Sequence, residues 1–264
     1  MLEAIHRALQ LVEFLPQKVV QGLLQSNLAI ALTRQRRFAE AREHFSRSLH
    51  LLQQNGQLQR YAAVLHYRAT LFLRQGLWAE ARRDYLEELS SMRRSSEERS
   101  QAHALEGLAQ LSIEEGDLAA AAAFAEEGLG LAEGCGDIVL LADLHLALGL
   151  AHYLSGALPA AAVSLEQARG VAGDWLPPDH QGLLSCLSRA LAHSRGEPFS
   201  AIDDASDFGR ILAALESGAL AALQSCIDPT QTPDILLRLA ARAVRRTLLT
   251  APPAATRPLQ HSAT

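Results

Sequence analysis

The sequence has one lysine, Lys18, among 24 basic residues, and aromatic side chains make up only 5% of the chain. A phosphate-binding loop needs a lysine after a glycine-rich turn, and Lys18 follows no such turn. The three cysteines, Cys135, Cys186 and Cys226, are far apart and form no Cys-x-x-Cys pair. This pattern fits neither a disulfide framework nor a zinc site and is typical of a reducing compartment.

Targeting signals are also missing. The amino-terminal residues carry Glu3 and His6 early and do not have the pattern of a signal peptide. No apolar run is expected to reach the length of a bilayer span. We therefore expect a cytoplasmic protein that does not interact with membranes.

The net charge of −5 argues against a general nucleic-acid binder, so no nucleic-acid partner is expected. The charge is unevenly distributed, with +5 in residues 1–100 and −10 in residues 101–264. Such a gradient fits a partner with opposite charges at its two ends, or copies of this chain that stack head to tail. It fits equally the solvated faces of helices whose composition drifts along the chain.

A short motif recurs every forty residues. A turn residue is followed five places later by an alanine and preceded seven places earlier by a small residue, with an apolar helical pattern on each side. The turns are Arg36, Gly76, Gly116, Gly156 and Gly196; the alanines are Ala41, Ala81, Ala121, Ala161 and Ala201; the small residues are Ala29, Ala69, Ala109 and Gly149. Each copy therefore predicts a helix, a tight turn and a second helix that approach closely.

This layout resembles the tetratricopeptide repeat over about residues 1–205. Phe45 and Tyr85 stand where that family has an aromatic residue in its second helix. The period is forty instead of 34, and this longer repeat resembles arrays in large bacterial regulators. The resemblance implies an all-α fold, a right-handed α-solenoid of helix-turn-helix repeats closed by C-terminal capping helices.

The predicted organisation has four parts. Residues 1–16 are half a repeat, residues 17–216 form five repeats, residues 217–250 form capping helices and residues 251–264 form a disordered tail. The half repeat leaves an apolar face at Ile5 and Leu9, which predicts an assembly surface, a missing preceding segment or a simple cap. The arginines of the last capping helix, at 238, 242, 245 and 246, predict a polar outer face.

The resemblance implies that the first helix of each repeat lines a concave groove that binds partners. The candidate groove residues are Asn27, Arg34, His66, Tyr67, Thr70, Arg74, His103, Gln110, Leu146, Leu150 and Tyr153. The family's clamp for chaperone tails is absent, because its positions hold Ser26, Ile30, Tyr67, His103 and Gly107. The alternatives are a solvated groove and a groove filled by the protein's own C-terminal helices.

No His-Glu-x-x-His, Gly-x-Ser-x-Gly or Gly-x-Gly-x-x-Gly pattern occurs, so neither an enzyme, a metal site nor a cofactor is expected. The expected function is non-catalytic recognition of a protein or peptide through the groove. One alternative is a regulatory module of a bacterial signalling or transcriptional system that senses a ligand or peptide. Another is a structural protein that self-assembles, for example as a homodimer, through the half repeat.

Overall fold

The computed structural model describes residues 17–197, 207–217, 219–230, 232 and 234–250, together with Arg7 and Gln10. Apart from Arg7 and Gln10, the predicted half repeat lies outside the described residues, and so do Ile5, Leu9, the start of the second helix of repeat five and the predicted tail. Within these ranges the chain is helical and contains no strand.

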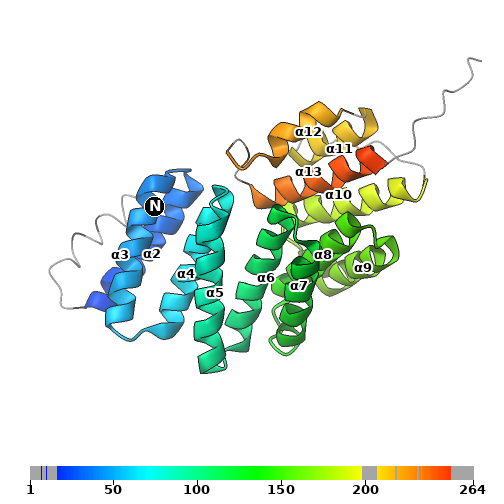
Figure 1. Cartoon of the computed structure of the whole chain (residues 1–264). Coiled ribbons are helices and arrows are strands. Elements are labelled where there is room, and N and C mark those ends of the chain that lie inside the picture. The colour runs from blue at the N-terminus through cyan, green and yellow to red at the C-terminus, as the bar shows by residue number, and fades with distance from the viewer. Residues whose placement is uncertain are drawn as a thin grey trace, which may run out of the picture.

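Successive helices pair side by side along the chain (Figure 1). Four pairs carry the repeat: α2 (Lys18–Arg34) with α3 (Phe38–Gln54), α4 (Leu58–Arg74) with α5 (Trp78–Ser95), α6 (Glu98–Glu115) with α7 (Leu118–Ala132), and α8 (Ile138–Ser155) with α9 (Leu158–Ala172). A short 3₁₀ turn, η1 (Gly173–Trp175), leads to α10 (Pro178–Ser194), α11 (Asp207–Ser217), α12 (Leu220–Ile227) and α13 (Ile235–Thr250). The predicted all-α solenoid is confirmed.

The turn inside each repeat has one residue in the left-handed conformation. Arg36 has φ of 61°, and the four glycines at the equivalent places have φ between 72° and 94°. Glycine reaches this conformation without the steric cost that a side chain adds. Glycine therefore recurs every forty residues because the turn needs a residue in the left-handed conformation. Arg36 adopts the same conformation at a steric cost.

Ser96, between the second and third repeats, is a second non-glycine residue in this conformation, with φ of 56°. We expect Ser96→Gly to raise the free energy of unfolding by about 0.5–1 kcal/mol, because relief of strain outweighs the added freedom of the unfolded chain. Gly116→Ala, at φ of 84°, should lower it by about 1 kcal/mol. Urea unfolding of both variants checks the pair, and a less stable Ser96→Gly protein would contradict the argument.

The small residues of the repeat are at the closest helix contacts. Ala29, Ala69 and Ala109 are fully buried. A Cβ added to Gly149 would lie 2.9 Å from Leu165 Cδ2, too close for an ordinary contact. The bulky partners Phe45, Tyr85 and Leu165 are buried as well, so the predicted alternation of small and large residues holds.

Helix α8 differs from one expectation. It is the one helix in the described part of the chain that is long and apolar enough to cross a membrane, whereas no run of that length was expected. More than half of it is buried, and it packs against α6, α7, α9, α10 and α13. Burial on several sides accounts for its apolar composition, as in the core helix of a soluble protein.

Candidate functional site

The eleven candidate groove residues lie on α2, α4, α6 and α8, the first helices of the four repeats. The structure does not keep them in one continuous surface. Leu146, Leu150 and Tyr153 are covered by the C-terminal helices. Arg34 and Arg74 line a cavity near the N-terminal repeats, and the exposed Asn27 lies on the same helix as Arg34. The remaining five, His66, Tyr67, Thr70, His103 and Gln110, lie between these two regions on α4 and α6.

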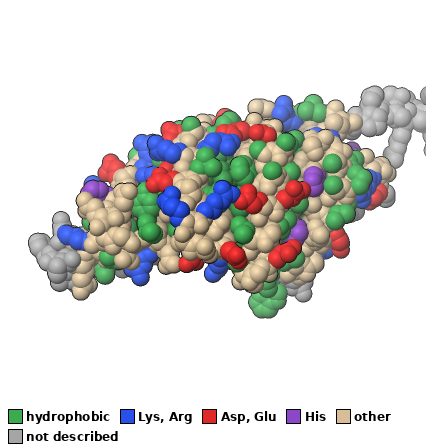
Figure 2. Space-filling model, turned by 60° about the horizontal axis from the view of Figure 1, so that its bottom comes forward, with side chains coloured by type: hydrophobic (Ala, Val, Ile, Leu, Met, Phe, Trp, Pro, Cys, Tyr) green, Lys and Arg blue, Asp and Glu red, His purple; other side chains and the backbone are tan. Residues whose placement is uncertain are grey.

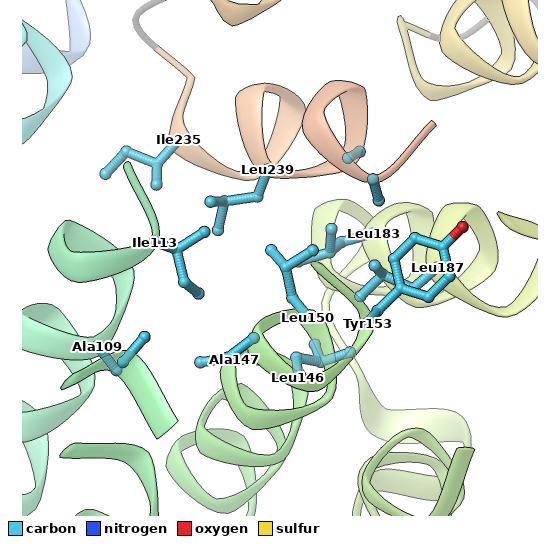
Figure 3. Close-up of a cluster of buried hydrophobic side chains, with 14 of the residues drawn as sticks. Ala109, Ile113, Leu146, Ala147, Leu150, Tyr153, Leu183, Leu187, Ile235 and Leu239 are labelled. Carbon is cyan, nitrogen blue, oxygen red and sulfur yellow. The ribbon is translucent and has the colours of Figure 1, made fainter. Parts of the chain in front are cut away.

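The covered end of the groove is apolar. Leu150 and Tyr153 are completely buried, and Leu146 is 2% exposed. Figure 3 shows Leu146, Leu150 and Tyr153 facing Leu183 and Leu187 of α10, with Leu239 of α13 nearby. The Tyr153 hydroxyl is 2.8 Å from Ser194 Oγ and is also hydrogen-bonded to Thr247 on α13. These three residues bind the protein's own helices in this structure, so they are not accessible to a partner.

Buried charges hold α13 in place. Arg238 is fully buried, donates from Nε to Glu114 Oε1 at 2.7 Å, and donates from Nη2 to the Leu73 carbonyl at 3.0 Å. Arg242 Nη2 donates to the other oxygen of Glu114, also at 2.7 Å. Arg246 donates to the Leu154 carbonyl. We name Arg238, Glu114 and Arg242 the buried arginine cluster.

The predicted polar outer face of α13 is therefore wrong for most of its arginines. Arg238 and Arg242 point inward to Glu114, while Arg246 lies over the Tyr153 ring at 5.0 Å from its centroid. Arg245 is exposed. The spacing of four residues places Arg238, Arg242 and Arg246 on one side of the helix, the side that meets the repeats.

Ionisable side chains gather in the middle of the groove, on α4, α5, α6, α8 and α10. His66 Nδ1 lies 3.3 Å from Glu88 Oε2, and the rings of His66 and His103 are 5.9 Å apart, in an edge-on arrangement. Further along, His180 Nε2 lies 3.0 Å from Asp143 Oδ1. Between them is Glu106, whose carboxylate accepts a hydrogen bond from Gln110. We name these six side chains the groove cluster: His66, Glu88, His103, Glu106, Asp143 and His180.

The groove cluster shifts the pKa values of its members. Burial, and then the charge of Asp143, raise the pKa of Glu106 to about 8. Burial also raises the pKa of Asp143, against the opposing effect of His180. Burial by itself lowers the pKa of His180, but the hydrogen bond and charge of Asp143 outweigh it and the pKa is raised. Near neutral pH Glu106 therefore keeps a proton that an exposed glutamate would release.

His66 and His103 respond in opposite directions. Burial lowers the pKa of His66, yet the charge and hydrogen bond of Glu88 together raise it above its ordinary value. Burial and the neighbouring His66 lower the pKa of His103. Asp137, which caps α8 at the Leu140 amide and binds Arg99 at 2.6 Å, lies 3.7 Å from His103. His66 is thus the histidine of this pair that holds a proton more readily.

Two other predicted residues border the groove cluster. Tyr67 is 47% exposed. Thr70 Oγ1 is hydrogen-bonded to the His66 carbonyl and to the Tyr85 hydroxyl, so it supports α4 and Tyr85. Within the described ranges, no three His, Cys, Asp or Glu side chains converge as a metal site requires.

Four members of the groove cluster were not predicted as site residues. Glu106 and Asp143 stand forty residues after His66 and His103, so the repeat period alone could have found them. Glu88 and His180 have no such signal, because the equivalent places forty residues away hold Ser48 and Gly128 for Glu88 and Leu140 for His180. The charge gradient is visible on the surface, where arginines gather over the N-terminal half and acids over the C-terminal half (Figure 2).

No protein-family model matches the sequence, and no curated protein matches it. Among solved structures, the apo form of RapI is similar, with a TM-score of 0.66 and 10% sequence identity. The match covers 93% of this chain and 69% of the RapI chain. At this identity the likeness shows the fold alone, a helical-repeat solenoid, and it fits a protein built from tetratricopeptide-like repeats.

Proposed function

We propose that the protein is a non-catalytic binding module whose groove cluster takes a protein segment or peptide that carries a basic side chain. The fold supports a binding role, because helical-repeat solenoids present extended concave surfaces. RapI, which shares the fold, has an apo form, a term used for proteins that also bind a ligand. A regulatory role in the cytoplasm is part of this proposal.

The observation that carries the proposal is the pair of acids Glu106 and Asp143. In the described part of the chain, no arginine or lysine forms an ion pair with either carboxylate. Asp143 has a histidine partner, and the hydrogen bond that Glu106 accepts among the described residues comes from the neutral amide of Gln110, with His66 and His180 acting on it through their charge. A lysine or arginine from a partner would supply the missing positive charge in a groove where water screens it poorly.

The contacts within the groove cluster favour binding over catalysis. His66 and His180 each face a carboxylate. Among the described residues, no hydroxyl or thiol is hydrogen-bonded to the imidazole of His66, His103 or His180, as an activated nucleophile would be. The groove histidines are thus arranged as charge partners.

A ligand-sensing role has one observation in its favour. Helix α13 bonds to residues from α4, α6 and α8 and packs against α10, so it bridges the groove across several repeats. A ligand that enters between repeats would alter the spacing that α13 spans. Binding at the groove would then change how firmly α13 is held.

The test is selection from a random peptide library displayed on phage, with the wild-type chain as bait. The double variant Glu106→Gln, Asp143→Asn serves as counter-bait, and Glu126→Gln, an exposed acid on α7, serves as the matched control. We expect enriched peptides rich in lysine or arginine that bind the wild type and the Glu126→Gln protein and bind the double variant at least about tenfold more weakly. Enrichment of peptides without basic residues, or equal binding to all three proteins, would refute the proposal.

A further inference from the structure

A second site lies apart from the groove cluster, in a cavity of about 620 Å³ between the first repeats and the C-terminal helices. Its walls come from the ends of α2 and α4, the turn before α3, α11, α12 and the start of α13. The volume is in the range of small-ligand sites. The cavity shares no residue with the groove cluster, so the two sites can be tested separately.

Positive charge dominates this cavity. Four arginines line it, Arg34, Arg36, Arg74 and Arg210, against one acid, Asp234. The Asp234 carboxylate accepts a hydrogen bond from the Leu237 amide, which uses part of its capacity at the start of α13. No described carboxylate forms an ion pair with Arg34, Arg36 or Arg74, whereas the neighbouring Arg37 pairs with Glu40. Among the described residues, these three arginines therefore lie near one another without an ion pair to a carboxylate.

Arg36 provides an independent observation. It occupies the left-handed position of the first turn, where the other four repeats have glycine, and its side chain lines the cavity. The backbone strain of a non-glycine residue at this position brings no benefit to the turn itself. Strained residues of this kind concentrate at functional sites, where the side chain is needed.

Arg74 provides another observation. Its Nε is buried and has no hydrogen-bond partner among the described residues. A buried donor without an acceptor is uncommon in folded proteins and indicates a missing partner. The dipole of α4 accounts for an arginine in the last turn of the helix, but it accounts neither for the unsatisfied Nε nor for the convergence with Arg34 and Arg36.

Part of the remaining lining is apolar. Phe38, Ile211, Ala214, Leu223 and Leu237 form the wall that accompanies the arginines. Guanidinium groups recognise planar oxyanions through paired N–H donors, and apolar walls favour the body that carries the oxyanion. The cavity thus combines two kinds of recognition.

We propose that this cavity binds a small ligand or peptide end with an oxyanion, a carboxylate or a phosphate, on an apolar body. Arg34, Arg36 and Arg74 supply the positive charge, and Phe38, Ile211 and Leu237 contact the apolar part. Because the C-terminal helices form one wall, an occupied cavity joins the first repeat to the end of the solenoid.

The experiment uses the full chain, thermal unfolding and isothermal titration calorimetry. The probes are N-acetyl-trileucine with a free carboxylate, the same tripeptide as its C-terminal amide, and phenyl phosphate. We expect the acid to bind and to raise the melting temperature, and the amide to do neither at about 1 mM. Stronger binding of phenyl phosphate than of the acid identifies phosphate as the preferred oxyanion and supports the site.

Three variants assign the binding to the cavity. Arg74→Gln should weaken the binding of the acidic probe at least about tenfold. Arg94→Gln, an exposed arginine on α5, should bind within about twofold of the wild type. Arg36→Gly should bind more weakly and yet melt at a higher temperature without ligand, because glycine relieves the strained turn. If Arg74→Gln does not fold, the exposed Arg34→Gln replaces it.

The proposal is overturned if neither acidic probe binds the wild type at about 1 mM, or if the amide binds as well as the acid. Equal loss of binding in the Arg74→Gln and Arg94→Gln proteins also overturns it. Peptide selection at the groove cluster is independent of these results, so failure at one site leaves the other standing.

Discussion

Arg238→Ala should lower the free energy of unfolding by about 3–5 kcal/mol, because it leaves Glu114 with a buried charge and only Arg242 to offset it. Removing one partner of a fully buried ion pair costs far more than losing a surface pair. The change also removes the donors to the Leu73 and Thr232 carbonyls. Equilibrium unfolding in urea, followed by circular dichroism, measures the loss.

The matched control is Arg245→Ala, on the exposed side of the same helix, which should change the free energy of unfolding by less than about 0.5 kcal/mol. It makes the same change from arginine to alanine, with the same change in helix propensity, and leaves the buried arginine cluster intact. If both variants lost the same free energy of unfolding, the arginine side chains would affect stability only through the helix propensity of α13. The cluster would then have no special part in holding it.

Glu106→Gln should make the protein more stable at alkaline pH, on the order of 1–2 kcal/mol at pH 8 to 9 once solvent screening is allowed for. The pKa of Glu106 is about 8 in the folded chain, against an ordinary value of 4.5. Between these values the folded state binds more protons than the unfolded state, so wild-type stability falls as pH rises. Glutamine stays neutral and removes this slope.

Melting temperatures of both proteins from pH 5 to pH 9 test this expectation. The separation between the two curves should be smallest at pH 5, grow up to about pH 8, where Glu106 loses its proton in the folded chain, and stay nearly constant above it. Glu126→Gln, an exposed acid, should run parallel to the wild type throughout. Parallel curves for Glu106→Gln as well would show that Glu106 titrates normally and would remove the main support for a basic partner.

The repeat was predictable because it is a local pattern. A glycine at a left-handed turn and a small residue at a close helix contact are each required by neighbouring backbone, so Gly116 and Ala109 report structure without knowledge of the rest of the fold. The same reasoning placed the candidate residues on the first helices correctly. Local patterns therefore predicted both the class of fold and the helices on which the candidate residues lie.

The end of the groove was not predictable in the same way. Whether Leu150 faces a partner or the chain's own α13 depends on contacts such as Arg238 with Glu114, which are 124 residues apart. The arginines at 238, 242 and 246 indicated a charged helix face, but their acidic partner could not be read from sequence. A charge pattern shows which charged residues share one face of a helix. Whether that face is exposed or packs against the core depends on tertiary contacts.

The return of α13 to the middle repeats has a consequence for synthesis of the protein. An ordinary solenoid can fold repeat by repeat, since each unit contacts its neighbours. Here Arg238 donates to the Leu73 carbonyl, which lies 165 residues earlier in the chain. It also pairs with Glu114, which is made 124 residues before it. At ribosomal rates that interval is about 6–25 s. After α8 has been made, its apolar side stays uncovered for the later part of this interval, which makes the nascent chain a candidate client for chaperones until α13 is made.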